Sequence, residues 1–434
     1  MKKITITGTK GKTTVSSVLA TVLRSVENKV LNVDTNGAYI NGELIMSKSD
    51  SQLIWDVVPT VAPGRFLYLL HDPTAAKVEG QHHGNLEGVA VLEASLGSGT
   101  LSGLAYYGHD VGVFTNVFED HIGSRPDLNN REDIGRSKSF VFSRINKDGY
   151  AVFNADDDII CANLSHCKDG VTLIPFGLDF KFFDLANHLK KGGKALTVRD
   201  GNVVFLEGDS TKVLFGVSDI IWTFNGKFIP SVYNLLAVTG ALLGYGDGEI
   251  SSILIQALID SRLDPYSGRL TLLRNAENVT ILADYAHEKQ SLKSVADLAK
   301  ELKVSEDNKV IGVLRLAWDR TEDLIEDTAR YIAPVYDSFV IYDKIDGFWR
   351  QPSSRYRTGQ RQFTQEVGKI STIFANELIK VRDEASVVRI IREDEAIAAA
   401  AKQAKPGDVV VFIVNDDIKR SIDFIRTTFN AEFV

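Results

Sequence analysis

Two glycines, two lysines and three threonines stand together near the start of the chain, in the stretch GTKGKTT. The residues before this stretch, KKITIT, predict a buried strand. Apolar residues at helical spacing follow the stretch and predict a helix. A glycine-rich loop can wrap its backbone N–H groups around a phosphate, and the start of a helix adds the positive end of its dipole. The stretch therefore predicts a phosphate-binding loop, which consists of Gly8, Thr9, Gly11, Lys12, Thr13 and Thr14.

Two kinds of side chain in this loop have specific chemistry. Lys12 can reach the outer phosphates of a nucleotide, and a threonine hydroxyl can bind Mg²⁺. The spacing differs from the pattern G-x-x-x-x-G-K-[ST], because Gly8 lies only three positions before Gly11. A plain glycine turn is the alternative, but the strand, loop and helix in succession favour nucleotide binding.

Composition limits the classes of protein to which the chain can belong. Its 434 residues suffice for two or three domains of ~100–200 residues each. A net charge of -8 argues against a general nucleic-acid surface, and no apolar run approaches the ~20 residues of a membrane helix. The two cysteines, Cys161 and Cys167, are too few for a disulfide framework and favour a cytoplasmic location. They flank His166, but two thiols without a metal are the simpler interpretation.

Short apolar runs and helical patterns alternate over the first third of the chain. Such runs, among them GVAVLEAS and DVGVFTNV, lack polar alternation and predict a mostly parallel sheet covered on both faces. Residues 171–230 alternate more and contain the turn sequence RDGN, which predicts a small β-rich insertion of hairpins. The α/β pattern restarts at about residue 279. We predict a P-loop domain over residues 1–265 and a Rossmann-like α/β domain over residues 266–434, joined near LDPYSGRL.

Further polar motifs follow in a fixed order, namely VLEAS, TNVFEDHIG, GRSKSFVF, SVYNLLAV, YSGRL, ADYAHE and WDR. Together with the loop they resemble the Mur ligase superfamily, the ATP-dependent amide ligases of peptidoglycan, folylpolyglutamate and cyanophycin synthesis. Within it, DTNGAYINGELIM and the residues after Glu93 are most similar to the C-terminal module of cyanophycin synthetases. Muramyl ligases have a UDP-binding domain before the loop, and cyanophycin synthetases have an ATP-grasp half there. The resemblance therefore implies a ligase core without either.

The resemblance also implies a reaction. The γ-phosphate of ATP would pass to a substrate carboxylate, an amino-acid amine would displace it from the acyl phosphate, and ADP and phosphate would be released. Catalytic roles would fall to Lys12, His121 and Lys138. Mg²⁺ would be held by Thr13, Glu93, His121 and Lys138, the last as a carbamate. Outside the loop, the nucleotide would contact Asn234, Arg269, Asp284, His287 and Asp319.

Most of these residues also have a structural interpretation. Glu93 could be a solvated acid, His121 could pair with Asp120, and Lys138 could lie on the surface. The acids at 156–158 could form a turn and cap a helix, and Arg269 could make a salt bridge in the linker. The order of the motifs along the chain favours the functional interpretation.

Three features depart from the family pattern. Lys10 stands where the family has asparagine, and its ammonium could contact a phosphate or face solvent. Residues 315–318, RLAW, replace a glycine-rich turn before Asp319, which would crowd the backbone near a ligand. A basic stretch could be a solvated loop or could bind an anionic substrate; it contains Arg350, Arg355, Arg357 and Arg361.

The sequence leaves several functions open. The first is a cyanophycin-synthetase-like ligase that joins an amino acid to a polyacid. The alternatives are a folylpolyglutamate- or muramyl-like ligase and a non-catalytic nucleotide-binding subunit. We expect small acid and amine substrates, no nucleic acid and no membrane. A homo-oligomer and a separate ATP-grasp partner both remain open, and we expect the second domain to close over ATP about the linker.

Overall fold

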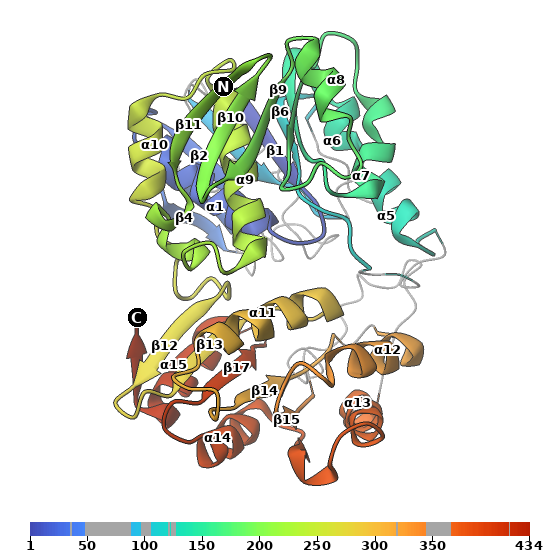
Figure 1. Cartoon of the computed structure of the whole chain (residues 1–434), viewed down its shortest axis with the longest axis vertical. Coiled ribbons are helices and arrows are strands. Elements are labelled where there is room, and N and C mark those ends of the chain that lie inside the picture. The colour runs from blue at the N-terminus through green and yellow to red at the C-terminus, as the bar shows by residue number, and fades with distance from the viewer. Residues whose placement is uncertain are drawn as a thin grey trace, which may run out of the picture. The chain divides into compact units, whose positions relative to one another are not determined.

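The computed structural model describes residues 1–34, 37–47, 88–96, 106–119, 122, 127–317, 320–343, 366–415 and 417–434. These residues form two compact units, and the chain passes from the first to the second between Arg262 and Leu263 (Figure 1). Within these ranges, no helix combines the length and the apolar character that crossing a bilayer requires.

Unit 1 is built on one sheet, which has the strand order β11-β10-β9-β8-β7-β6-β1-β5-β2-β3-β4 over the described residues. Strands β8, β7, β6, β1, β5 and β2, which are neighbours in that order, run parallel. The apolar runs in the first third of the chain predict such a mostly parallel sheet. The strands are β1 (Lys2–Thr7), β2 (Val30–Val33), β3 (Gly37–Ile40), β4 (Glu43–Ser47), β5 (Val89–Glu93), β6 (His109–Phe114), β7 (Ile145–Asn154), β8 (Thr172–Phe176), β9 (Lys194–Arg199), β10 (Asn202–Glu207) and β11 (Ser210–Gly216).

Two long helices cover the middle of this sheet. Helix α1 packs on β5 and β2, while α9 packs on β6 and β7 and also contacts α1. Both helices bury most of their apolar residues, so the start of α1 is fixed against the strands and against α9. Within the described ranges, the helices of unit 1 are α1 (Lys12–Leu23), α5 (Arg131–Lys138), α6 (Phe140–Ser143), α7 (Asp158–Ala162), α8 (Leu185–Lys190), α9 (Ile229–Tyr245) and α10 (Ser252–Ile259).

The sequence predicts hairpins over residues 171–230, and strands β9, β10 and β11 pair antiparallel as expected. Strand β8 instead pairs parallel with β7, and Leu185–Lys190 form helix α8, so the prediction is wrong for that part of the segment. Asp200 and Gly201 link β9 to β10 with φ values of 49° and 74°, a left-handed turn that glycine and aspartate adopt readily. The hairpins continue the edge of the main sheet beyond β8. The β-rich insertion therefore extends the main sheet of unit 1 and forms no separate layer.

Unit 2 has its own sheet, with the strand order β16-β15-β14-β17-β13-β12-β18 over the described residues. Strands β13 to β17 run parallel, and β12 and β18 add an antiparallel edge. This arrangement agrees with the predicted Rossmann-like second domain. The strands are β12 (Thr271–Asn275), β13 (Thr280–Asp284), β14 (Val310–Leu314), β15 (Ser338–Ile341), β16 (Val387–Arg389), β17 (Val409–Ile413) and β18 (Ala431–Phe433).

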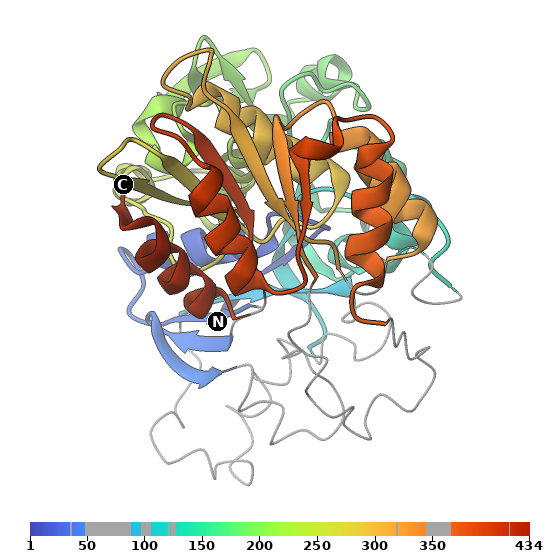
Figure 2. The same cartoon turned by 90° about the horizontal axis from the view of Figure 1, so that it is seen from below.

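Helices pack on both faces of the unit 2 sheet. One face receives α14 and α15, which lie side by side against a core that includes Ile281, Val313 and Phe412 (Figure 2). The other face receives α11, which packs on β13, β14 and β17 and is followed by α12 and α13. The helices of unit 2 are α11 (Lys289–Glu301), α12 (Glu322–Ile332), α13 (Lys369–Ile379), α14 (Glu393–Gln403) and α15 (Ile418–Phe429).

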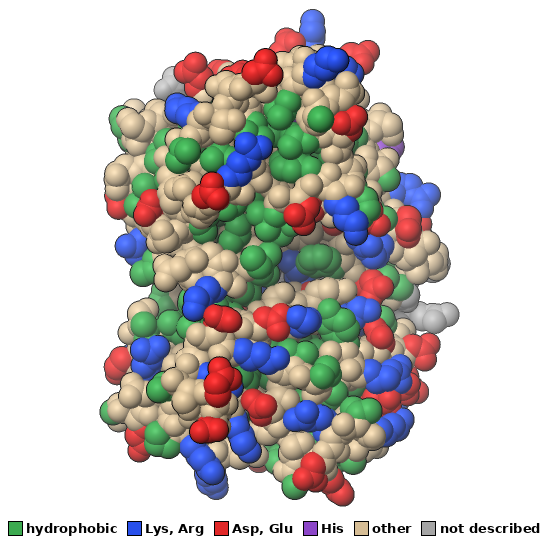
Figure 3. Space-filling model, in the orientation of Figure 1, with side chains coloured by type: hydrophobic (Ala, Val, Ile, Leu, Met, Phe, Trp, Pro, Cys, Tyr) green, Lys and Arg blue, Asp and Glu red, His purple; other side chains and the backbone are tan. Residues whose placement is uncertain are grey.

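Acidic and basic side chains are interspersed over the face drawn in Figure 3. Surface ion pairs join such side chains in the described part of the chain, for example Lys419 with Asp423 and Arg392 with Asp394. Exposed pairs of this kind contribute little to stability. We therefore look for the charged residues of a functional site among the buried side chains.

Candidate functional site

The loop between β1 and α1 is shaped by its two glycines. Gly8 has a φ of 143° and Gly11 a φ of 82°, both in a region that favours glycine. A Cβ on Gly8 would lie 2.0 Å from Thr115 Oγ1, and a Cβ on Gly11 would lie 2.1 Å from Asn234 Oδ1. Because Thr115 and Asn234 pack directly against the backbone at these positions, only glycine fits at either one, as is typical of a phosphate-binding loop.

The loop is held from below by the end of the neighbouring strand β6. Asn116 accepts the N–H of Lys10 with Oδ1 at 2.8 Å, and its Nδ2 donates to the carbonyl of Lys10 at 3.1 Å. Thr115 Oγ1 donates to the same carbonyl at 2.6 Å, and the Asn116 carbonyl accepts the N–H of Thr9. The sequence reasoning gave these two residues no role. Their position directly after the strand beside β1 was the available signal.

The side chains of the loop contact its own backbone and the end of strand β5. Lys12 Nζ donates to the carbonyl of Thr9 at 3.0 Å, so the ammonium lies over the loop. Thr13 Oγ1 donates to Glu93 Oε2 at 2.9 Å, and both side chains are buried. The alternative of a solvated Glu93 is therefore wrong. Thr9 and Thr14 are also buried, and the hydroxyl of Thr9 accepts the N–H of Phe118 at 3.0 Å.

Two further predicted residues belong to the helices of unit 1. Lys138 ends α5 and is only 3% exposed, so the alternative of a surface lysine is wrong. Burial of a charged amine is unfavourable without a specific interaction, so the burial of Lys138 favours a functional role for this residue. Asn234 lies on α9 with its amide oxygen directly above Gly11, so it borders the loop. Its predicted contact with adenine stays a prediction, as does the carbamate on Lys138.

In unit 2, three predicted residues gather around the end of β13. Asp284 accepts the N–H groups of Leu270 at 2.9 Å and Ala286 at 2.7 Å, so its carboxylate shapes the following turn. His287 Nδ1 lies 2.9 Å from the carbonyl of Tyr285, and the two rings meet edge to face. Arg269 places its guanidinium 5.8 Å from the centre of the Tyr285 ring. Arg269 has no ion pair with another described residue, so the linker salt bridge is not supported.

Several predicted residues lie outside the described ranges. They are His121, Asp319, Trp318, Arg350, Arg355, Arg357 and Arg361. Their roles stay predictions.

The acids that follow β7 have the structural role that the sequence left open for them. Asp157 caps α7 by accepting the N–H of Ile160 at 3.0 Å and also accepts the N–H of Val117 at 2.7 Å. Asp156 accepts the N–H of Leu178 at 2.6 Å and the hydroxyl of Tyr233 at 2.8 Å.

Burial raises the pKa of the free Cys161 and Cys167 thiols to about 12, so both stay protonated.

The residues at the loop fit a magnesium nucleotide. Two hard oxygen donors, Thr13 Oγ1 and Glu93 Oε2, stand together beside a glycine loop that admits no Cβ at Gly8 or Gly11. No three His, Cys, Asp or Glu side chains within the described ranges are grouped to hold a metal by themselves. The phosphates and water would therefore complete the coordination, as is usual for Mg²⁺.

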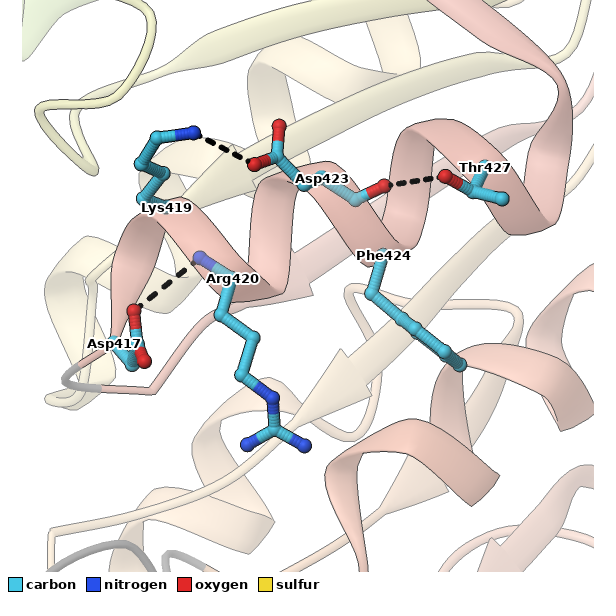
Figure 4. Close-up of a pocket in the computed structure, with 6 residues that line it drawn as sticks. All are labelled: Asp417, Lys419, Arg420, Asp423, Phe424 and Thr427. Carbon is cyan, nitrogen blue, oxygen red and sulfur yellow. Dashed lines mark hydrogen bonds and ion pairs between the residues drawn. The ribbon is translucent and has the colours of Figure 1, made fainter.

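A surface hollow lies elsewhere, along helix α15 (Figure 4). Its lining consists of helix residues bonded to one another, such as Lys419 with Asp423 at 2.9 Å and Thr427 Oγ1 with the Asp423 carbonyl at 2.9 Å. Arg420 and the half-exposed Phe424 complete the wall, with the Arg420 guanidinium extended. None of the predicted site residues lines it, so we assign it no role.

Comparisons with known proteins decide the family. The sequence profile of the Mur ligase middle domain matches residues 6–242, and that of the Mur ligase glutamate ligase domain matches residues 268–413. The chain belongs to the Mur ligase family. The first profile covers the loop and the sheet of unit 1, and the second covers most of unit 2.

Curated members of the family are about a quarter identical to this chain over the aligned residues. The cyanophycin synthetase of Geminocystis herdmanii is 26% identical over 424 residues, which span 98% of this chain and 43% of that protein. The UDP-N-acetylmuramoyl-L-alanyl-D-glutamate–2,6-diaminopimelate ligase of Bacillus cereus is 25% identical over 320 residues, 71% of this chain and 56% of that protein. The chain thus spans less than half the length of the cyanophycin synthetases that it matches.

Solved structures support the fold. The bifunctional folylpolyglutamate synthase/dihydrofolate synthase of Yersinia pestis, complexed with AMPPNP and Mn, matches with a TM-score of 0.62 at 16% identity over 99% of this chain and 89% of that one. The MurF ligase of Thermotoga maritima in complex with ADP gives a TM-score of 0.58 at 16% identity, covering 99% and 80%. Both likenesses show the Mur ligase architecture of two α/β units.

Proposed function

We propose that the chain is an ATP-dependent acid–amino-acid ligase that releases ADP and phosphate and acts in the cytoplasm. The observation that carries the proposal is the loop of unit 1, in which the Gly8 and Gly11 backbone, Lys12 and the bonded pair Thr13–Glu93 converge. Membership of the Mur ligase family, whose named relatives are ligases, supports the same reaction class.

In the proposed reaction the substrate carboxylate attacks the γ-phosphorus of ATP, and ADP leaves. The amine then attacks the acyl carbon, phosphate leaves, and the nitrogen loses a proton to solvent or a base. Lys12 would neutralise charge on the phosphoryl group in flight, and the N–H groups around Gly11 would hold the remaining phosphates. Thr13 and Glu93, with Lys138 and His121 as further predicted ligands, would hold Mg²⁺, which would offset the charge of the phosphates.

The cyanophycin synthetases among the relatives suggest the first substrates to test. We propose arginine as the amine and an aspartate side-chain carboxylate, presented by an aspartyl peptide, as the acid. A folylpolyglutamate- or muramyl-type acid is the alternative, which the matched folate and muramyl ligases support.

A panel of acids and amines with ATP and Mg²⁺ tests the proposal, with ADP and phosphate as the readout. We expect ADP release that requires both an acid and an amine. Hydroxylamine in place of the amine should give a hydroxamate, because it traps an acyl phosphate. Tight nucleotide binding without amine-dependent ADP release for any pair would instead indicate a non-catalytic subunit.

A further inference from the structure

The sheet of unit 2 changes the direction of its connections between β14 and β17. The chain leaves β14 toward α12, on the face that α11 covers, and leaves β17 toward α15, on the opposite face. These two strands are neighbours in the sheet, and β13 lies on the other side of β17. Open parallel sheets bind ligands in the crevice outside the carboxyl ends of strands at such a point.

Arg315 occupies this place in the fold. It follows β14 directly, and its side chain is fully buried at 0% exposure. Nε donates to the carbonyl of Val414, just after β17, at 3.2 Å, and Nη2 donates to the same oxygen. The guanidinium also lies 4.6 Å from the centre of the Tyr285 ring, just after β13. One side chain therefore bridges the ends of three adjacent strands.

The charge of Arg315 is not balanced within the described part of the chain. No carboxylate among the described residues lies within ion-pair distance of it, and Nη1 is buried without a hydrogen-bond partner. A guanidinium stays protonated in proteins, so it cannot reduce this cost by losing its proton. A carboxylate oxygen at Nη1 would supply both the missing acceptor and the missing charge.

We propose that Arg315 binds a substrate carboxylate that takes no part in the bond being formed. The inference rests on the proposed function, because an acid–amino-acid ligase handles more carboxylates than the one it activates. Two sources share this chemistry, namely a second carboxylate of the acid and the carboxylate of the incoming amino acid. The planar guanidinium matches a carboxylate, and the neutral Val414 carbonyl leaves the positive charge available to it.

Calorimetric titration of the full chain, with AMPPNP and Mg²⁺ present, tests this inference without turnover. The ligands are matched pairs with and without the relevant carboxylate, namely succinate against succinamate and L-arginine against agmatine. We expect a carboxylate ligand to bind the native chain and to bind Arg315→Met at least about tenfold more weakly. The Arg315→Lys variant should have an intermediate affinity, because an ammonium keeps the positive charge but lacks the paired N–H donors of the planar guanidinium.

Arg420→Met is the matched control, because Arg420 is an exposed arginine of the same unit. It should leave the affinities within about twofold of the native values. The ligand whose binding weakens in Arg315→Met identifies the source of the carboxylate. A loss of succinate binding indicates the acid substrate, and a loss of L-arginine binding indicates the incoming amino acid. Equal affinities of the native chain and Arg315→Met, or no carboxylate binding below about 10 mM, would overturn the inference. Tighter Arg315-dependent binding of inorganic phosphate would also contradict it.

A melting curve separates ligand binding from a purely structural role. Replacement of a buried unpaired charge by an apolar side chain of similar volume is often neutral or stabilising, so we expect Arg315→Met to melt at or above the native temperature. A lower melting temperature with unchanged affinities would make Arg315 a structural bridge only. Should this variant fail to fold, Arg315→Lys decides by its affinities alone. Because binding is read without ADP release, a failed ligase assay leaves this result intact.

Discussion

The connections that follow β1 and β14 share their surroundings in the chain, yet they are built in opposite ways. Both follow buried parallel strands and lead into a helix. After β1, Gly8 and Gly11 bring no side chain of their own, and Thr115 and Asn234 pack directly against the backbone there. After β14, Arg315 and Leu316 fill the corresponding space, at 0% and 2% exposure.

The difference teaches how a fold prepares for an anion. Backbone N–H groups at the start of α1 are neutral dipoles, so the loop tolerates the absence of a ligand at little electrostatic cost. Arg315 presents a full charge that burial penalises until a partner arrives. The predictions below test this contrast.

The largest effect is expected from Gly11→Ala. The added Cβ would meet Asn234 Oδ1 at 2.1 Å, and the φ of 82° is unfavourable for alanine. We expect the affinity for AMPPNP with Mg²⁺ to fall by at least about 100-fold, measured by calorimetry. Gly192→Ala is the control, because Gly192 has a φ of 77° but no atom within 4 Å of its Cβ position. Similar affinities in the two variants would show that the loop binds no nucleotide.

Glu93→Gln should have the next largest effect. The amide oxygen can still accept the hydroxyl of Thr13, so the fold should persist while one metal-binding charge is lost. We expect the Mg²⁺ concentration needed for half-maximal AMPPNP binding to rise about 10–100-fold. Glu207→Gln, a half-exposed acid of the same unit, serves as the control and should leave that concentration unchanged. An unchanged magnesium requirement in Glu93→Gln would refute a metal role for Glu93.

His109 and Arg315 are both fully buried, and each has a side-chain nitrogen without a hydrogen-bond partner. The pH dependence of the free energy of unfolding should distinguish them. Burial lowers the pKa of His109 to about 4, so the folded state keeps the ring neutral while the unfolded state takes up a proton below about 6.5. The free energy of unfolding should therefore fall by about 2 kcal/mol between pH 6.5 and pH 5. Denaturant unfolding of the native chain and of His109→Gln should show this slope only in the native chain.

Arg315 should contribute no such slope, because a guanidinium does not titrate in this range. Arg315→Met and the native chain should lose stability in parallel as the pH falls. A steeper slope in the native chain than in Arg315→Met would mean that the charge of Arg315 is paired with a titrating acid.

The smallest effect concerns the helix starts. The residues that precede α1 and α12, Gly11 and Thr321, make no side-chain cap hydrogen bond, whereas Ser251 caps α10 by accepting the N–H of Leu254. We expect Ser251→Ala to lower the free energy of unfolding by about 1 kcal/mol and Thr321→Ala by less. Thermal unfolding measures both. Equal losses would show that the start of α12 is capped after all.

Much of the fold could be predicted because its signals are local. KKITIT, GVAVLEAS and DVGVFTNV are short stretches rich in β-branched or apolar residues, and they contain β1, β5 and β6. The RDGN turn likewise predicted the hairpin of β9 and β10. The place of that hairpin at the edge of the main sheet was not predictable, since it depends on contacts between residues far apart in the chain.

The site shows the same division. Gly8, Gly11 and Lys12 could be recognised from their types and spacing, because a phosphate loop is a local structure. The clamp of Lys10 by Thr115 and Asn116 was missed, because it joins residues more than a hundred positions apart. Lys138 could not be distinguished from a surface lysine until its burial was known.

The sequence by itself determined the strand and helix periods, the glycine loop and the order of the motifs, since each depends on neighbouring residues. Only the tertiary structure decided which strand ends adjoin, and with that the bond between Thr13 and Glu93 and the burial of Arg315 beside Val414. The physical reason is that burial and charge compensation are set by whatever the fold brings within a few ångströms, and no local pattern records that.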